Sequence, residues 1–549
     1  MSTARIIAIA LIATSLTVAF ASGVAAGTEA EPETSESINA TLVSAYPNPV
    51  ARGDPGEFVA VRFDRPTNTS GWTLTDGKTT ARLPNRTIDG TVAFSMKPDH
   101  ARNHTEHPVA ALSGRLLLAD DGDRLELQAG ERTVDSARYR RAPVSEVWHF
   151  ETETWQPIGA TDHDPIRTDG GEATVFVLPD APEETVRQLR TAEDRILVAG
   201  YTFSSERIAD TLEAAASDGV DVRVLLDGAP VGGVSDRQAR KLDRLTDAGV
   251  TVRVLTGSHT RYRHHHAKYA VIDDRALVST ENFKPAGTGG MSSRGWSVVL
   301  NDDETAAELT SVYERDWTWR AATPWNTYRD GRTFTDADPA LGSFEPRHEP
   351  ERVTVDSATL LVAPDNAGDE LVSMMESADD RVLVQQVRID SRENRLLRAA
   401  MDAADRGVRV RIHLSDSWYV ESENAALVEW LNRRAETEEW DLEARVDDAD
   451  GYGKIHTKGV VVDDVAVVGS LNWVRSAKSD NRKLLVALEG SEPAEYYASV
   501  FESDWSGDER RAIPAGVLAV VAVAGSGTLL LLRRIEFVGK AEPVTDWKW

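Results

Sequence analysis

The sequence predicts an α/β protein in which two pseudo-symmetric αβ halves follow an all-β, immunoglobulin-like sandwich and precede one transmembrane helix. Three observations predict this order. Residues 171–505 repeat one pattern of apolar strands and helices, residues 38–142 form short alternating strands, and residues 513–532 carry no charge. A chain of 549 residues is too long for one core, since domains usually have about 100–200 residues.

The sandwich is predicted from segments such as EFVAVRF and GRLLLAD, which are separated by Gly, Asp, Asn and Pro. The order of these segments resembles a lamin-tail domain, on the residues 56–59 (GEFV), 71–76 (GWTLTD), 123–127 (DRLEL) and 134–139 (VDSARY). The resemblance implies a binding or spacer module and leaves a ligand of this domain open. Asp120, Asp121 and Asp123 are compatible with calcium, but a turn between two strands is the favoured interpretation.

The α/β halves are predicted from an internal repeat. The segment DRILV at 194–198 returns as DRVLV at 380–384, and GVDVRV returns as GVRVRI. Apolar strands that alternate with helices indicate a largely buried sheet. The predicted boundaries are 171–320 for the first half, 321–356 for a linker and 357–508 for the second half.

The two ends of the chain predict its location. Residues 1–26 have the charge, apolar run and small-residue site of a signal peptide, with an uncleaved anchor as the alternative. Residues 513–532 are long enough to cross roughly 30 Å of hydrocarbon, although a buried core helix is the alternative. Arg533 and Arg534 follow, so the tail 533–549 is expected in the cytoplasm. The prediction is a single-pass cell-membrane protein with an extracellular ectodomain, and four glycosylation sequons in its N-terminal fifth agree.

The composition excludes several kinds of chemistry. There is no cysteine, so disulfides, thiolate zinc sites and a cysteine nucleophile are excluded. The net charge of −28 argues against a protein that coats nucleic acid through a broad basic surface. Of the 61 basic residues, 50 are Arg and 11 are Lys. An acidic chain with few lysines is typical of proteins that work in molar salt, where charges are screened within about 3 Å, and ordinary solubilising charge is the alternative.

Five polar positions recur between the halves with one spacing. The first set is His266, Lys268, Asp273, Thr280 and Asn282. The second set is His456, Lys458, Asp463, Ser470 and Asn472, each 190 residues further on. His and Lys two positions apart on a strand project to the same face. Two copies around a pseudo-twofold axis would surround one anion with imidazoles, amines, hydroxyls and amides, which fits a tetrahedral phosphate.

The doubled motif resembles that of the phospholipase D superfamily, H-x-K-x4-D followed by G-S-x-N, and the resemblance covers residues 171–505. It implies cleavage of a phosphodiester through a phosphohistidine intermediate, without a metal or other cofactor. By this resemblance His266 attacks phosphorus, and His456 protonates the leaving oxygen and then activates water.

The resemblance also implies roles for the other motif residues. Those that hold the non-bridging oxygens are Lys268, Lys458, Asn282 and Asn472. Thr280 and Ser470 are expected to form hydrogen bonds within the phosphate site, and Asp273 and Asp463 are expected to be structural.

The chain departs from the family motif at two points. Family members commonly carry a Glu about a dozen residues after the Asn, but Gly295 and Lys483 stand there, so both carboxylates are absent from that position. The first motif also has Ser279 where Gly is usual. His264 and His265 precede the motif; a metal site is conceivable, but polar residues at the start of a strand are the favoured interpretation.

These patterns predict a surface-anchored, monomeric phosphodiesterase that cleaves nucleic acid or phospholipid. The lamin-tail-like neighbour favours nucleic acid, and the membrane anchor favours lipid. The alternative is a non-catalytic cell-surface binding or adhesion protein that keeps the same fold.

Overall fold

The computed structural model describes residues 40–49, 56–257, 259–336, 344–447, 452–474 and 480–506. They belong to one compact unit, which begins at Ala40. The predicted signal peptide, transmembrane helix and cytoplasmic tail lie outside these ranges. None of the helices within them is both long and apolar enough to span a membrane.

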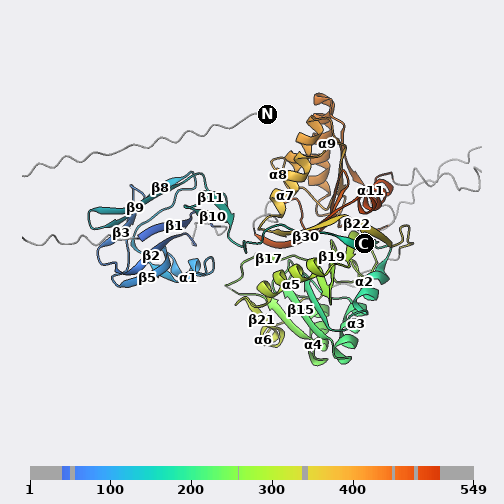
Figure 1. The fold of residues 1–549 in the computed structure, drawn as a ribbon, viewed down its shortest axis with the longest axis horizontal. Coiled ribbons are helices and arrows are strands. Elements are labelled where there is room, and N and C mark those ends of the chain that lie inside the picture. Colours follow the sequence, from blue (N-terminus) through green and yellow to red (C-terminus); the bar gives the residue numbers. More distant parts are fainter. Residues whose placement is uncertain are drawn as a thin grey trace, which may run out of the picture. The chain divides into compact units, whose positions relative to one another are not determined.

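The N-terminal region contains two β-sheets (Figure 1). The first has the order β11-β10-β1-β2-β5-β6, with strands β1 (Ala40–Tyr46), β2 (Phe58–Asn68), β5 (Thr87–Ser95), β6 (Val109–Ala111), β10 (Glu146–His149) and β11 (Thr154–Pro157). The second has the order β7-β4-β3-β8-β9, with strands β3 (Trp72–Thr75), β4 (Thr80–Arg82), β7 (Ser113–Gly114), β8 (Asp123–Ala129) and β9 (Arg132–Tyr139). A short helix, α1 (Pro98–Ala101), precedes β6.

The two sheets pack through apolar side chains that alternate along the strands. Phe63 on β2 lies against Trp72 on β3, with ring centroids 5.8 Å apart, and both are buried. The sheet continues to Pro157 through β10 and β11, beyond the predicted end at residue 142. Asp123 begins β8 directly after a turn at Gly122, as expected for the Asp-rich segment.

The first α/β half contains a ten-stranded sheet. Its main order is β21-β16-β15-β14-β18-β19-β20-β13-β22. The strands are β13 (Gly171–Leu178), β14 (Arg195–Gly200), β15 (Asp221–Asp227), β16 (Thr251–Leu255), β18 (Tyr269–Ile272), β19 (Arg275–Ser279), β20 (Ser293–Leu300), β21 (Ala322–Pro324) and β22 (Glu351–Val355). The helices are α2 (Pro182–Leu189), α3 (Glu206–Ser217), α4 (Asp236–Asp247), α5 (Asp303–Trp317) and α6 (Trp325–Arg329).

The second half contains a nine-stranded sheet with the main order β12-β23-β30-β29-β28-β24-β25-β26. The strands are β12 (Ile166–Thr168), β23 (Ser357–Ala363), β24 (Arg381–Gln386), β25 (Arg409–Ser415), β26 (Leu442–Asp447), β28 (Lys458–Val462), β29 (Val465–Gly469) and β30 (Asn481–Glu489). The helices are α7 (Ala367–Glu376), α8 (Arg395–Asp405), α9 (Glu421–Glu438) and α11 (Ser491–Ser506).

The halves exchange short strands, which the predicted boundaries did not anticipate. β12 precedes the first half in sequence but pairs with β23 of the second sheet, and β22 lies in the predicted linker but pairs with β13 of the first. β17 (His264–His265) pairs with β30, and β27 (Lys454–Ile455) pairs with β20. The predicted linker is therefore partly structured, since β21, α6 and β22 fall within it.

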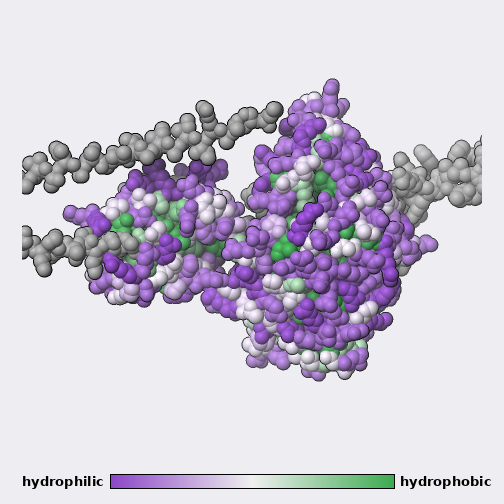
Figure 2. All heavy atoms as spheres, viewed as in Figure 1, coloured by the Kyte–Doolittle hydropathy of each residue, from purple (hydrophilic) through white to green (hydrophobic). Residues whose placement is uncertain are grey.

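One apolar core joins the halves. Strands from both sheets meet the inner faces of α5 and α11 there, and Tyr313 on α5 and Tyr497 on α11 are fully buried. Helices α7, α8 and α9 cover the second sheet (Figure 1). The outer surface is largely hydrophilic in the view of Figure 2, as expected from the high charge.

Candidate active site

The strand exchange brings the two motifs to one place. The backbone N–H of His266 donates to the carbonyl of Arg482, and that of His456 donates to the carbonyl of Arg294, both at 2.9 Å. Each motif histidine is therefore held by the sheet of the opposite half. A third link crosses the site, where Nζ of Lys458 donates to the carbonyl oxygen of Thr280 at 3.4 Å.

Buried guanidinium groups fix the strands that carry these carbonyls. Arg482 donates from Nε to Oδ2 of Asp316 at 2.8 Å and from Nη1 to Oδ2 of Asp365 at 3.1 Å, and its side chain is fully buried. Arg294 is related to it by the pseudo-twofold axis and pairs with Asp180 and Asp504. Burial alone would raise the pKa of Asp316, but Arg482 outweighs burial and holds that pKa well below its usual range.

His266 is surrounded by amines. Nζ of Lys483 lies 2.6 Å from its Nδ1, and Nζ of Lys268 lies 2.9 Å from the same atom. The ring of Tyr201 packs on the imidazole with centroids 4.5 Å apart. Burial, followed by Lys268 and Lys483, lowers the pKa of His266 well below its ordinary value.

His456 has a carboxylate neighbour instead. Oε2 of Glu281 lies 3.1 Å from its Nδ1. Burial and then Lys458 and Lys454 lower the pKa of His456 well below its ordinary value, as for His266. Burial raises the pKa of Glu281, and Lys458 opposes that rise. Glu281 is a residue that the sequence analysis missed.

Lysine side chains gather at this site. Within the described ranges, five lysines face the two histidines: Lys268, Lys284, Lys454, Lys458 and Lys483. Burial and Lys454 lower the pKa of Lys458 to about 7, and Glu281 opposes them. The chain carries a net charge of −28, so this cluster creates local positive charge suited to an anion.

The amide and hydroxyl groups of the motifs differ in their hydrogen bonding. Oδ1 of Asn282 and Oδ1 of Asn472 are buried and have no partner within the described ranges. The hydroxyls instead bind backbone: Oγ1 of Thr280 accepts from the N–H of Trp296 at 3.0 Å, and Oγ of Ser470 accepts from that of Leu484 at 3.1 Å. Both hydroxyl residues are fully buried, and their hydroxyls hold the neighbouring strands through backbone hydrogen bonds.

The motif aspartates lie at the opposite ends of their strands. Asp273 accepts hydrogen bonds from the backbone N–H groups of residues 193–195, each at 2.9 Å. Asp463 accepts three from residues 379–381 at the same distance. Both have positive φ, 51° and 48°, as expected in a tight turn. Burial opposes these bonds, but the bonds lower the pKa of both carboxyls.

His264 and His265 contact carboxylates of the scaffold. The N–H of His265 donates to Oδ2 of Asp227 at 2.6 Å, and its Nε2 lies 3.5 Å from Oδ2 of Asp316. Nδ1 of His264 lies 3.6 Å from Asp227. Within the described ranges, no group of three or more His, Asp or Glu side chains is placed to hold a metal ion.

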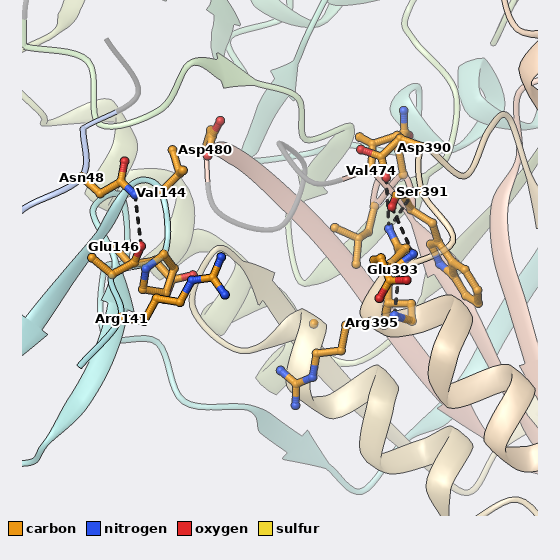
Figure 3. A pocket seen from close by; sticks show the side chains of 18 of the residues that line it. Asn48, Arg141, Val144, Glu146, Asp390, Ser391, Glu393, Arg395, Val474 and Asp480 are labelled. Atoms are coloured by element: carbon orange, nitrogen blue, oxygen red, sulfur yellow. Dashed lines mark hydrogen bonds between the residues drawn. The ribbon is translucent and has the colours of Figure 1, made fainter. Parts of the chain in front are cut away.

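A pocket of about 900 Å³ opens beside Asn472 (Figure 3). In the second half its lining includes Trp473, Asp390 and Arg395. Its lining is mixed in charge, and it offers space next to one of the predicted phosphate contacts.

The comparisons agree with the two-half architecture. Residues 185–317 and 371–505 each match the family described as cardiolipin synthase, PLD-like domain. One matched segment lies in each half, and each contains one copy of the doubled motif. No curated protein matches the chain.

Three solved structures are similar to parts of this chain. The phosphatidylserine synthase of Haemophilus influenzae Rd KW20 is 15% identical with a TM-score of 0.45, over 64% of this chain and 92% of its own. Nuc, a phospholipase D family member from Salmonella typhimurium, is 20% identical with a TM-score of 0.24, over 29% of this chain and 98% of its own. NucT from Helicobacter pylori is 18% identical with a TM-score of 0.24, over 29% and 99%.

Proposed function

We propose that this protein hydrolyses phosphodiester bonds through a phosphohistidine intermediate, in one site built by both halves. The observation that carries the proposal is the cross-half arrangement: Lys483 contacts His266, and Glu281 contacts His456. Two imidazoles and several buried amines therefore meet around one position, as phosphoryl transfer requires.

In the first step a ring nitrogen of one histidine forms a bond to phosphorus while the P–O bond to the leaving group breaks. The other histidine gives its proton to the leaving oxygen. In the second step that histidine takes a proton from water as the new O–P bond forms, and the N–P bond breaks to release the first histidine. Lys268, Lys458, Asn282 and Asn472 stabilise the charge on the non-bridging oxygens.

The substrate is proposed to be a nucleic acid or a phospholipid, with the pocket beside Asn472 as space for the group attached to the phosphate. The proposed location is the cell surface, with residues 513–532 as the anchor, and it rests on the sequence alone. The alternative predicted from the sequence is a non-catalytic binding protein. The observation on its side is that Lys483 stands where the family motif has a Glu.

The test is an activity panel in molar salt with the full chain in detergent. The substrates are bis(p-nitrophenyl) phosphate, single-stranded and duplex DNA, RNA and phospholipid vesicles, and His266→Ala and His456→Ala variants serve as controls. The proposal expects hydrolysis of at least one substrate that both variants lose or slow. Binding without turnover on every substrate would support the non-catalytic alternative.

A further inference from the structure

The carboxylate beside His456 comes from an unexpected position. Glu281 occupies the unrestricted place in the motif between Thr280 and Asn282, and its counterpart in the second half is Leu471. Its side chain is only 2% exposed, and Oε2 lies 3.1 Å from Nδ1 of His456. A carboxylate buried to this extent requires a local reason.

Gly295 provides the space for Glu281. A Cβ atom on residue 295 would lie 2.3 Å from Cγ of Glu281 and 2.8 Å from its Oε1, closer than real Cβ atoms approach. The glycine is therefore needed for the close approach of Glu281. Residue 295 is also where the family motif places a Glu, so the carboxylate at position 281 fills the volume of the one that is missing.

Ser279, the other departure from the family motif, also contacts Glu281. Its Oγ accepts from the backbone N–H of Glu281 at 3.0 Å and lies 2.8 Å from Oγ of Ser297. The counterpart in the second half is Gly469, where a Cβ atom would lie 2.5 Å from Cα of Leu485. Both departures of the first motif, Ser279 and Gly295, thus act together to orient Glu281.

Among the described residues of the second half, no carboxylate takes the equivalent place beside His266. Lys483 stands at the position equivalent to Gly295, and its Nζ lies 2.6 Å from Nδ1 of His266. The charged groups that face His266 are Lys268, Lys483 and Lys458, and His456 also lies near it. Those that face His456 are Lys458, Lys454, Lys268, Lys284 and Glu281. The two histidines are chemically different although their strands are equivalent.

We propose that Glu281 is the positioning residue of His456, and that this pair, together with the amines beside His266, makes His456 the histidine that carries the proton. A carboxylate favours the imidazolium form and an ammonium group disfavours it. His266 then stays neutral and attacks phosphorus, while the proton on His456 moves to the leaving oxygen. This assignment rests on the proposed function and adds a residue that the family motif does not contain at this place.

The test uses the full chain with Glu281→Gln, which keeps the shape of the side chain and removes its charge. The matched control is Glu184→Gln, another carboxylate that is 1% exposed but lies on α2 away from the histidines. The first readout is the pKa of each imidazole in the free protein, followed by NMR of labelled histidine. In Glu281→Gln the pKa of His456 should fall by about one pH unit or more. In Glu184→Gln the pKa of His456 should stay unchanged.

The second readout is the dependence on the leaving group. Glu281→Gln should slow a phosphodiester with an alkyl leaving group by about 10²-fold. It should slow a p-nitrophenyl diester by less than about 10-fold, because that leaving group needs little protonation. A third variant, Glu281→Ala with Gly295→Glu, returns the carboxylate to the family position and should recover part of the lost rate.

The outcomes separate the two proposals. If the wild-type chain hydrolyses no phosphodiester, the proposed function fails, while the NMR readout still tests the pair. If Glu281→Gln leaves both the pKa of His456 and the leaving-group dependence at wild-type values, the positioning role of Glu281 is overturned.

Discussion

The two α/β halves are equivalent in their scaffold and different at their reacting centres. Asp273 and Asp463 each accept three backbone hydrogen bonds at 2.9 Å, and Arg294 and Arg482 are buried in matching aspartate pairs. The histidine neighbours differ, because one half supplies a glutamate and the other a lysine. The comparison teaches that the two halves match at the residues that support the strands. They differ at the residues that contact the two histidines.

The largest expected effect separates the two histidines. His266→Ala should be inactive on every phosphodiester, since no covalent intermediate can form. His456→Ala should lose about 10²–10⁴-fold on an alkyl leaving group but keep much of its first-step rate on a p-nitrophenyl diester. A burst experiment with both substrates measures this difference. Equal losses in both variants on both substrates would remove the distinction between the halves.

Replacement of the buried arginines tests the symmetric part of the comparison. Arg294→Met and Arg482→Met each leave buried aspartates without a cation, and each should cost about 3–5 kcal/mol of unfolding free energy. Chemical unfolding followed by tryptophan fluorescence measures the cost. Arg433→Ala, which removes an exposed pair with Glu429, should cost less than about 1 kcal/mol. A large cost for only one of the two buried arginines would show that the scaffold is not equivalent.

The pH dependence of anion binding tests the lysine cluster. Lys458 has a pKa lowered to about 7, so its ammonium form is lost as the pH rises through that value. The affinity for diethyl phosphate, which keeps one negative charge throughout, should therefore fall by about 10-fold above pH 7. Titration calorimetry at several pH values measures this. Lys458→Met should bind more weakly and lose most of the pH dependence, and an unchanged dependence in that variant would contradict the assignment.

The same pKa predicts the direction of a stability change. Because the pKa of Lys458 is lower in the folded protein than the ordinary 10.5, the unfolded chain binds more protons between about pH 7 and 10.5. The contribution of Lys458 to the unfolding free energy should therefore rise as the pH rises across this window, and fall as the pH drops toward 7. Comparison of the unfolding free energies of wild type and Lys458→Met at several pH values checks the sign.

The smallest expected effect is that of a chelator. Imidazoles and amines supply the proton transfers and positive charge in the proposed mechanism, so EDTA should leave the rate unchanged. Assays with and without EDTA, with added divalent cations as the control, measure this. Activity abolished by EDTA and restored by a divalent cation would contradict the metal-free mechanism.

Much of the fold could be predicted because it follows from patterns that lie along the chain. The repeat from DRILV to DRVLV and the equal spacing of the motifs predicted two related halves, which the match to the PLD-like family confirms. The strand exchange could not be predicted, because the pairing of β17 with β30 joins residues more than 200 positions apart.

Part of the candidate site follows from the same kind of pattern. The motif gave the histidines, lysines and asparagines, but it restricts neither position 281 nor the volume around Gly295. The side chain of Glu281 occupies the space that a Cβ atom at position 295 would need. This relation can be seen only in the three-dimensional structure. The signal available in the sequence was the combination of an acidic residue within the motif and a glycine where the family places Glu.

The central claim is that one site uses two electrostatically distinct histidines, and mass spectrometry of the trapped intermediate tests it most directly. Wild-type protein is quenched at alkaline pH during turnover of a phosphodiester, and the phosphorylated peptide is identified. The account predicts phosphate on His266, with more of it accumulating from a p-nitrophenyl diester in His456→Ala because water is no longer activated. Phosphate on His456, or steady turnover with no phosphohistidine at either position, would contradict it.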